Sequence, residues 1–199
     1  MKKIFFLLIL CLIVIIDIIA QHKNNVVNEY GGISPEAVEI IESTSYSEKD
    51  TGAVILFREA KMIVDDDGLH TISYHIIGQI FDEKAREDYS QIPITYNSYY
   101  ENLTLDFART IDKDKSFIDV SEDAIQIKTL PDYFGLNTYT DSKTLAFSLP
   151  ALKPGKFFEY QVTKKAKLPV IKNYWFESFN FHQVLYSISD PYFLRIDEN

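Results

Sequence analysis

The chain has almost no cysteine: Cys11 is the single one in 199 residues, and it lies inside an apolar N-terminal run. Beyond residue 20 there is therefore no thiol, which excludes disulfides and thiol catalysis from that part of the protein. The sequence also lacks a G-x-S-x-G turn for a serine nucleophile and a glycine-rich loop for phosphate. We therefore expect no catalytic residue and no cofactor, and we expect that the chain is not an enzyme.

Basic residues are also scarce. Lysine and arginine number 20 against 29 aspartates and glutamates, and the net charge is −9. Without residues 1–20 it becomes −10, because Lys2, Lys3 and Asp17 are lost together. An acidic surface repels phosphate backbones and anionic lipid, so the composition argues against nucleic acid and against electrostatic membrane docking.

Residues 1–20 have the layout of a secretory signal peptide. Lys2 and Lys3 form a basic start, residues 4–16 are an unbroken apolar run, and Ala20 is a small residue at the expected cleavage point. The run is shorter than the ~20 residues of a membrane-spanning helix. We expect an exported protein, periplasmic or associated with the cell envelope, with no membrane span after cleavage; an uncleaved anchor is the alternative.

Residues 21–52 predict an N-terminal arm followed by one short helix. Ser34 can cap the helix, Pro35 suits its first position, and Glu36 favours its N-terminal dipole. We expect a helix to residue 42, with Val38 and Ile41 among its buried positions.

From residue 53 onward the apolar residues recur with the period of two that β-strands show. Residues 53–65 and 69–81 predict a hairpin around a turn at 65–68, with a bulge near Arg58. Residues 103–111 and 117–120 predict a second hairpin. Further strands are expected at 91–96, 144–149, 156–163, 174–181 and 184–189, a helical turn at 82–89, and an irregular region at 121–144. The fold class that follows is all-β: an antiparallel β-sandwich over residues 53–199 with one short N-terminal helix.

Two patterns resemble metal sites but do not match them. His70 and His75 are five residues apart on one predicted strand and therefore point to opposite faces. The acidic run that starts at Asp65 has Ile76 at the twelfth position, where a calcium loop requires glutamate. We expect no metal site, and we interpret the acidic run as a hairpin turn.

Tyrosines in predicted loops are the remaining signal for binding. Loop aromatics can stack on sugars or anchor a partner protein, and they can equally pin long loops onto a sandwich. The candidate ligand or partner contacts are Tyr99, Tyr100, Tyr133, Tyr139 and Asp141.

Residues 94–160 resemble a known family: the domain of unknown function that precedes the core in bacterial transglutaminase-like (papain-like cysteine) envelope proteins, a transglutaminase-like N-terminal domain. The segments that carry the resemblance are YYENLTL at 99–105, ARTI at 108–111, DVSEDAI at 119–125, YTDS at 139–142, FSLP at 147–150, and Gly155 with Glu159-Tyr160. Where such proteins carry a Pro-Asp-Gly-like turn, this chain has Lys113-Asp114-Lys115, so we expect the tight charged turn at 112–115 to be less tight than theirs.

The resemblance implies a non-catalytic accessory domain that docks on, or presents substrate to, a cysteine-dependent core absent from this chain. The alternative is a free-standing extracytoplasmic module that binds a glycan or an envelope protein. Because residues 195–199 still have a strand pattern, we expect a truncated sandwich that is marginally stable or associates through an exposed edge.

Overall fold

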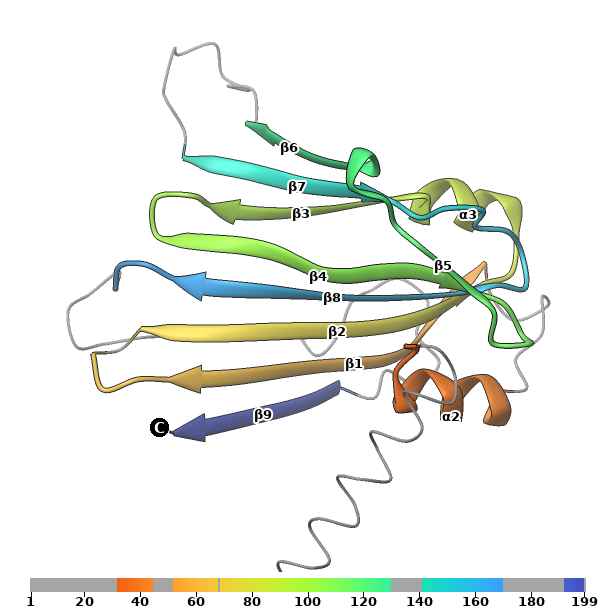
Figure 1. Ribbon diagram of the computed structural model, residues 1–199, viewed down its shortest axis with the longest axis horizontal. Coiled ribbons are helices and arrows are strands. Elements are labelled where there is room, and N and C mark those ends of the chain that lie inside the picture. The colour runs from red at the N-terminus through yellow and green to blue at the C-terminus, as the bar shows by residue number, and fades with distance from the viewer. Residues whose placement is uncertain (1–31, 45–51, 68, 130–140, 170–191, 199) are drawn as a thin grey trace, which may run out of the picture. The chain divides into compact units, whose positions relative to one another are not determined.

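A computed structural model describes residues 32–44, 52–67, 69–129, 141–169 and 192–198, the last range as backbone only (Figure 1). The chain divides into two compact units, Met1–Thr44 and Ser45–Asn199. None of the helices in these ranges is long and apolar enough to cross a membrane.

In the first unit the helix α2, Pro35–Ser43, begins where the sequence predicts. Ser34 is extended, and its Oγ accepts a hydrogen bond from the Ala37 amide at 3.1 Å. This contact satisfies one of the amides that every helix start leaves without an internal partner. Val38 is buried as expected, whereas Ile41 is only half-buried.

The second unit contains two β-sheets, which confirms the all-β sandwich. The larger sheet has the strand order β5-β4-β8-β2-β1-β9, and the smaller has the order β3-β7-β6. The strands are β1 Ala53–Val64, β2 His70–Ile80, β3 Gln91–Asn97, β4 Glu101–Ile111, β5 Phe117–Asp119, β6 Ile125–Thr129, β7 Ser142–Ser148, β8 Phe157–Ala166 and β9 Tyr192–Glu198. The helices are α3 Glu83–Tyr89 and the short 3-10 turn η1 Glu122–Ala124.

Both predicted hairpins are confirmed, because β1 pairs with β2 and β4 pairs with β5, each antiparallel. Three features differ from the prediction. β9 pairs with β1 in parallel, β6 lies in the region expected to be irregular, and α3 is a full helix capped by Asp82 rather than a single turn. The expected strands at 174–181 and 184–189 lie outside the described residues.

Two strands of the larger sheet contain a bulge. In β1 the register shifts between Ile55 and Phe57, beside the bulge expected near Arg58. In β4 it shifts between Leu105 and Phe107, which leaves Asp106 as the extra residue. A bulge changes the direction of neighbouring side chains. Asp106 accepts a hydrogen bond from Gln161 of β8, and Phe107 lies directly across from the same residue.

The main hydrophobic core lies between the two sheets. Phe147 of β7 and Tyr160 of β8, which belong to different sheets, have ring centroids 5.3 Å apart. Tyr89 of α3 closes one end of this core against Phe158, at 5.4 Å. Burial raises the pKa of Tyr160 far above its usual range, so this phenol stays protonated and has a structural role.

The opposite face of the larger sheet is buried as well along its central strands. Ile77, Ile111 and Phe157 are buried on it, next to the polar side chains described below. The strands β2 and β8 are therefore buried on both faces along much of their length. This double burial places ionisable side chains where solvent does not reach.

Candidate functional site

The turn between β3 and β4 carries two of the predicted contact residues, Tyr99 and Tyr100. Its shape is set by Asn97, whose side-chain oxygen accepts from the Tyr99 amide at 3.0 Å and whose carbonyl accepts from the Tyr100 amide at 3.2 Å. Glu101 closes the turn from the other side, because its carboxylate accepts from the Asn97 amide at 3.0 Å. An asparagine that bonds two residues ahead is a recurrent way to fix a turn.

Two other segments hold this turn from outside. The amide and the hydroxyl of Ser98 both donate to the Asp141 carbonyl, each at 2.8 Å. The Lys167 amide donates to the Tyr100 carbonyl at 2.7 Å, and its ammonium donates to the Ser98 carbonyl. The start of β7 and the residues after β8 are thus fastened to the turn (Figure 1), which keeps its backbone in one conformation.

The side chains on this turn form an exposed apolar surface. Tyr99 is 55% exposed and Tyr100 36% exposed, and their rings meet edge to face with centroids 4.9 Å apart. Leu168, whose amide approaches the Tyr100 carbonyl at 3.4 Å, is 46% exposed. We call Tyr99, Tyr100 and Leu168 the tyrosine turn surface. Because the two ring planes are 84° apart, it presents a face and an edge rather than one flat platform.

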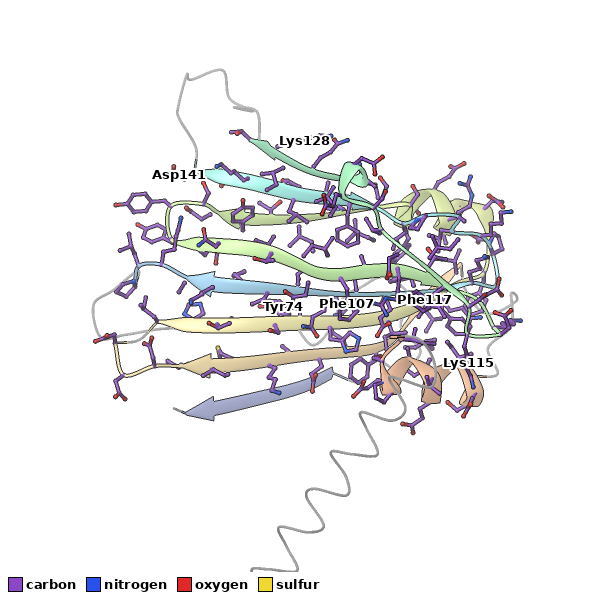
Figure 2. The ribbon with its side chains drawn as sticks, viewed as in Figure 1. Tyr74, Phe107, Lys115, Phe117, Lys128 and Asp141 are labelled. Carbon is purple, nitrogen blue, oxygen red and sulfur yellow. The ribbon has the colours of Figure 1, made fainter. Side chains whose placement is uncertain are left out.

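The structure brings together three of the five predicted contact residues. Tyr99 and Tyr100 lie on the turn, and Asp141 lies at the start of β7, with its side chain exposed (Figure 2). Tyr133 and Tyr139 lie outside the described residues. Lys167 and Leu168 were not predicted, because only the register of β4 against β8, which pairs Glu101 with Ala166, brings them to this turn.

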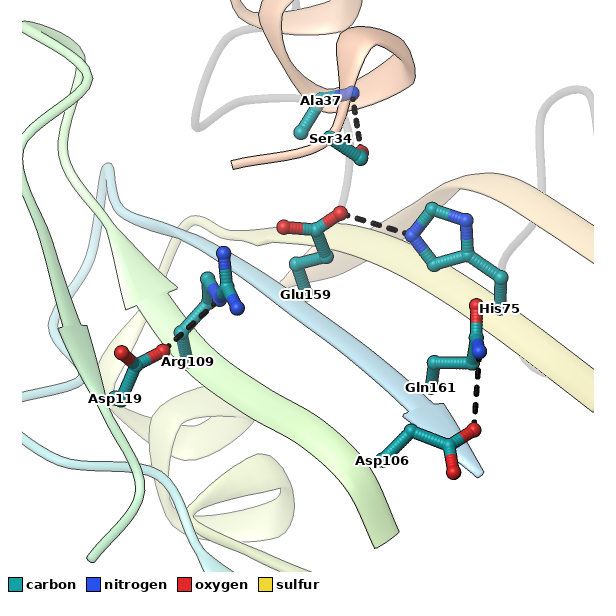
Figure 3. Close-up of polar contacts among 8 residues, drawn as sticks. All are labelled: Ser34, Ala37, His75, Asp106, Arg109, Asp119, Glu159 and Gln161. Carbon is teal, nitrogen blue, oxygen red and sulfur yellow. Dashed lines mark hydrogen bonds and ion pairs between the residues drawn. The ribbon is translucent and has the colours of Figure 1, made fainter. Parts of the chain in front are cut away.

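A second polar cluster lies on the face of the larger sheet that points away from the main core (Figure 3). Glu159 of β8 is fully buried, and His75 of β2 is 6% exposed. His75 Nε2 and Glu159 Oε1 are 2.9 Å apart. The other carboxylate oxygen, Oε2, is buried and has no hydrogen-bond partner within the described part of the chain. A buried carboxylate of this kind is stable only if nearby donors and charges compensate for lost hydration.

Arg109 of β4 lies directly across from Glu159 in the strand register. Figure 3 shows its guanidinium extending toward that carboxylate, while its Nε lies 3.1 Å from Asp119 Oδ1 of β5. The guanidinium also lies over two rings, 4.6 Å from the centroid of Phe107 and 5.0 Å from that of Phe117 (Figure 2). Such stacking stabilises a desolvated cation.

Aromatic rings and a bulge complete this cluster. The His75 imidazole meets Phe57 and Phe107 edge to face, at centroid distances of 5.2 Å and 5.8 Å. At the bulge, Asp106 accepts from Gln161 at 3.0 Å and from the Thr163 hydroxyl at 2.6 Å. The cluster links four strands through polar contacts. Glu159, His75 and Arg109 are buried at its centre, whereas Asp106 and Asp119 are exposed at its edge.

The acidic run that starts at Asp65 forms hydrogen bonds within its own turn. Asp65 Oδ1 accepts from the Leu69 amide at 2.7 Å, and the Asp65 amide donates to the Leu69 carbonyl at 2.9 Å. The acidic run is therefore part of a hairpin turn, as predicted. In the described ranges no group of three or more His, Cys, Asp or Glu side chains is placed to hold a metal ion. His22 and His182 lie outside those ranges.

The turn at Asp112, which the sequence predicts as a tight charged turn, is closed by two backbone hydrogen bonds. The Lys115 amide donates to the Asp112 carbonyl at 2.9 Å, and the Asp112 amide donates to the Ser116 carbonyl at 2.8 Å. Lys115 reaches this geometry with φ of 69°, in the region that favours glycine. The turn is therefore tight, and a side chain occupies the strained position.

Comparison with solved structures shows the fold. A proposed protease from Parabacteroides distasonis has 18% sequence identity and a TM-score of 0.53, over 58% of this chain and 23% of that one. The chain thus spans about a quarter of that protein's length. A family 3a carbohydrate-binding module from a Clostridium thermocellum scaffoldin, with flanking linkers, has 11% identity and a TM-score of 0.33, over 62% and 72% of the two chains. A TM-score that low carries no argument.

No curated protein matches the chain. A family model does: DUF3857, described as a domain of unknown function with a solved structure, matches residues 66–195. This confirms the part of the sequence resemblance that concerns a domain of unknown function. The match includes strands of both sheets and the turn that carries Tyr99 and Tyr100, and it covers more than half of the chain, which therefore belongs to the DUF3857 family.

Proposed function

We propose that this chain is a non-catalytic accessory domain of an exported transglutaminase-like protein. Its role is to dock on, or present substrate to, a cysteine-dependent core. The observation that supports the proposal is that this fold makes up only 23% of a longer protein, the proposed protease described above. The single cysteine, Cys11, lies within the predicted leader. The sandwich therefore has no cysteine nucleophile, and a cysteine-dependent core must be formed by other residues.

The tyrosine turn surface is the proposed contact. Binding hot spots are rich in tyrosine, lie on well-ordered backbone and have a polar rim. Tyr99 and Tyr100 lie on a turn held by several hydrogen bonds, and Lys167 and Asp141 provide charges of both signs beside them. A pre-organised turn loses little conformational entropy when it binds, which favours affinity.

A free-standing extracytoplasmic binding module is the second candidate. Exposed tyrosine rings also stack on sugars, and the carboxylate of Asp141 could accept hydrogen bonds from hydroxyl groups nearby. On this alternative the same turn would bind a glycan or an envelope protein without any core.

Binding to a recombinant transglutaminase-like core from the same genome, measured by titration calorimetry, distinguishes the two. We expect the Tyr99→Ala/Tyr100→Ala variant to bind the core at least about tenfold more weakly than the unchanged chain. Ile118→Ala, a change at an exposed apolar residue on β5, is the matched control and should bind normally. Binding of glycan but not of core would favour the alternative. Casein hydrolysis or amine transfer that copurifies with the chain would overturn both.

A further inference from the structure

The outer strand of the smaller sheet, β6, combines a bare backbone edge with an uncovered apolar side chain. β6 pairs with β7 on one side, and within the described part of the chain its other side has no hydrogen-bonded strand (Figure 1). An unpaired edge of this kind is a template for another strand.

Ile127, at the centre of β6, is the uncovered residue. It lies directly across from Leu145 of β7 and therefore points to the same face, the face of the main core. Leu145 is buried, whereas Ile127 is 60% exposed. The apolar row that runs across this sheet therefore ends in an isoleucine that nothing in the described residues covers.

Two of the other edge strands, β3 and β5, are protected in ways that β6 is not; the fourth edge is β9, at the far side of the larger sheet. β3, at the opposite edge of the same sheet, contains Pro93, which cannot donate a hydrogen bond to an added strand. β5, an edge of the larger sheet, is only three residues long. Lys128 is the one charged residue of β6, and it lies on the face opposite to Ile127 (Figure 2).

We propose that β6 is a homodimer interface, at which a second copy of this chain adds its own β6 in antiparallel orientation about a two-fold axis at Ile127. This inference does not depend on the proposed function. The sequence of β6, I-Q-I-K-T, is centred on Ile127, so the axis places Ile127 opposite Ile127 of the second copy. Each isoleucine then covers the other, and the apolar row becomes continuous.

The charges of β6 agree with this register. In the antiparallel pair Lys128 lies opposite Gln126 of the second copy, and Ile125 lies opposite Thr129, so no like charges meet directly. A partner strand with a charged residue across from Ile127 would leave this isoleucine without an apolar neighbour. A second copy places its own Ile127 at that position and therefore fits better. Five residues a side bury little area, so the dimer is weak and forms with rising concentration.

Sedimentation velocity of the full-length chain over a concentration series tests the proposal. We expect a monomer–dimer equilibrium, and we expect Ile127→Lys to raise the dissociation constant at least about tenfold, because two lysines then lie directly opposite each other. Ile118→Lys is the matched control, since Ile118 is 49% exposed on another edge strand. Any association through the leader is common to all variants and cancels. A monomer at every concentration, or equal effects of both lysines, would overturn the interface.

Cysteine cross-linking tests the register without relying on affinity. In chains with Cys11→Ser, an introduced cysteine is the single thiol. Residues directly opposite in an antiparallel pair have Cα atoms about 4.5–5.5 Å apart, within the range of a disulfide. Ile127→Cys should form a disulfide-linked dimer, whereas Gln126→Cys and Lys128→Cys should each do so poorly alone and efficiently when mixed. Cross-linking of Gln126→Cys or Lys128→Cys alone, at the yield of Ile127→Cys, would contradict the proposed axis.

Discussion

The first prediction concerns the buried contact between His75 and Glu159 and how much it contributes to the free energy of unfolding. Glu159 is fully buried, one of its oxygens contacts His75 at 2.9 Å, and the other has no hydrogen-bond partner among the described residues. His75→Leu removes that contact and fills its space with an apolar group. Breaking a buried pair from one side costs about 3–5 kcal/mol. Because Arg109 lies across from Glu159, we expect the lower end, about 3 kcal/mol.

Removing both partners should have a smaller effect than removing one. In His75→Leu/Glu159→Leu no carboxylate is left buried, and Arg109 keeps Asp119 at 3.1 Å. Well-packed apolar replacements of buried pairs are often neutral, so we expect a loss under about 2 kcal/mol. The coupling between the two sites should then exceed about 1 kcal/mol, above the ~0.5 kcal/mol within which independent changes add.

Urea unfolding at pH 7, monitored by far-UV circular dichroism, measures the free energy of unfolding. The four proteins to compare are the unchanged chain, His75→Leu, Glu159→Leu and the double variant. Glu159→Gln is a useful companion, because it keeps the shape and a contact to His75 while it removes the charge. If the two leucine substitutions add within about 0.5 kcal/mol, the two residues do not stabilise each other and the reasoning is wrong.

Three further predictions concern turns and close contacts. Gly78→Ala should destabilise the protein by about 1–3 kcal/mol, since a Cβ there would lie 2.3 Å from Cζ of the buried Phe158; an unchanged urea midpoint would contradict this packing. Lys115→Gly should stabilise it by about 0.5–1 kcal/mol by relieving a φ of 69°, and Lys115→Ala, which keeps the strain, should bring no such gain. The amide of Lys113 and the ammonium of Lys156 hold the pKa of Asp112 below its usual value. A carboxyl whose pKa is lowered by folding stabilises the protein above its unfolded pKa, and this stabilisation is lost as the pH falls. Asp112→Asn should therefore flatten the decline in stability below about pH 4. An identical pH profile of the two proteins would argue against this reasoning.

The parts of the fold that follow from local signals were predictable. Ser34 and Pro35 mark a helix start because capping chemistry acts within one turn of the chain. Gly155 marks the turn after Pro154 and does adopt a positive φ of 87°. The hairpin of β1 and β2 follows from two alternating runs around an acidic turn.

The parts that depend on distant residues were not. β6 is only five residues long and is followed by turn formers, so its alternation is too brief to stand out. The parallel pairing of β9 with β1 joins strands separated by most of the domain. Likewise His75 meets Glu159 only because β2 and β8 align in one register, and no local pattern in the sequence encodes that register.

The candidate site divides in the same way. Its exposed aromatic residues, Tyr99 and Tyr100, were predictable because they follow a turn-forming Asn-Ser pair. That Lys167 and Leu168 lie beside them was not, since their place is set by the pairing of β4 with β8.

The central position of β8 has a consequence for how the domain opens. β8 is hydrogen-bonded to β2 on one side and to β4 on the other, and both of its faces are largely buried. Its amides around Glu159 can meet solvent only when the larger sheet comes apart, whereas in a single chain the outer side of β6 is paired with no strand of the described ranges. Deuterium uptake should therefore be slowest along β8 and should report there the free energy of the whole unfolding reaction. The same strand that carries the buried carboxylate is thus the last part of the sheet to exchange.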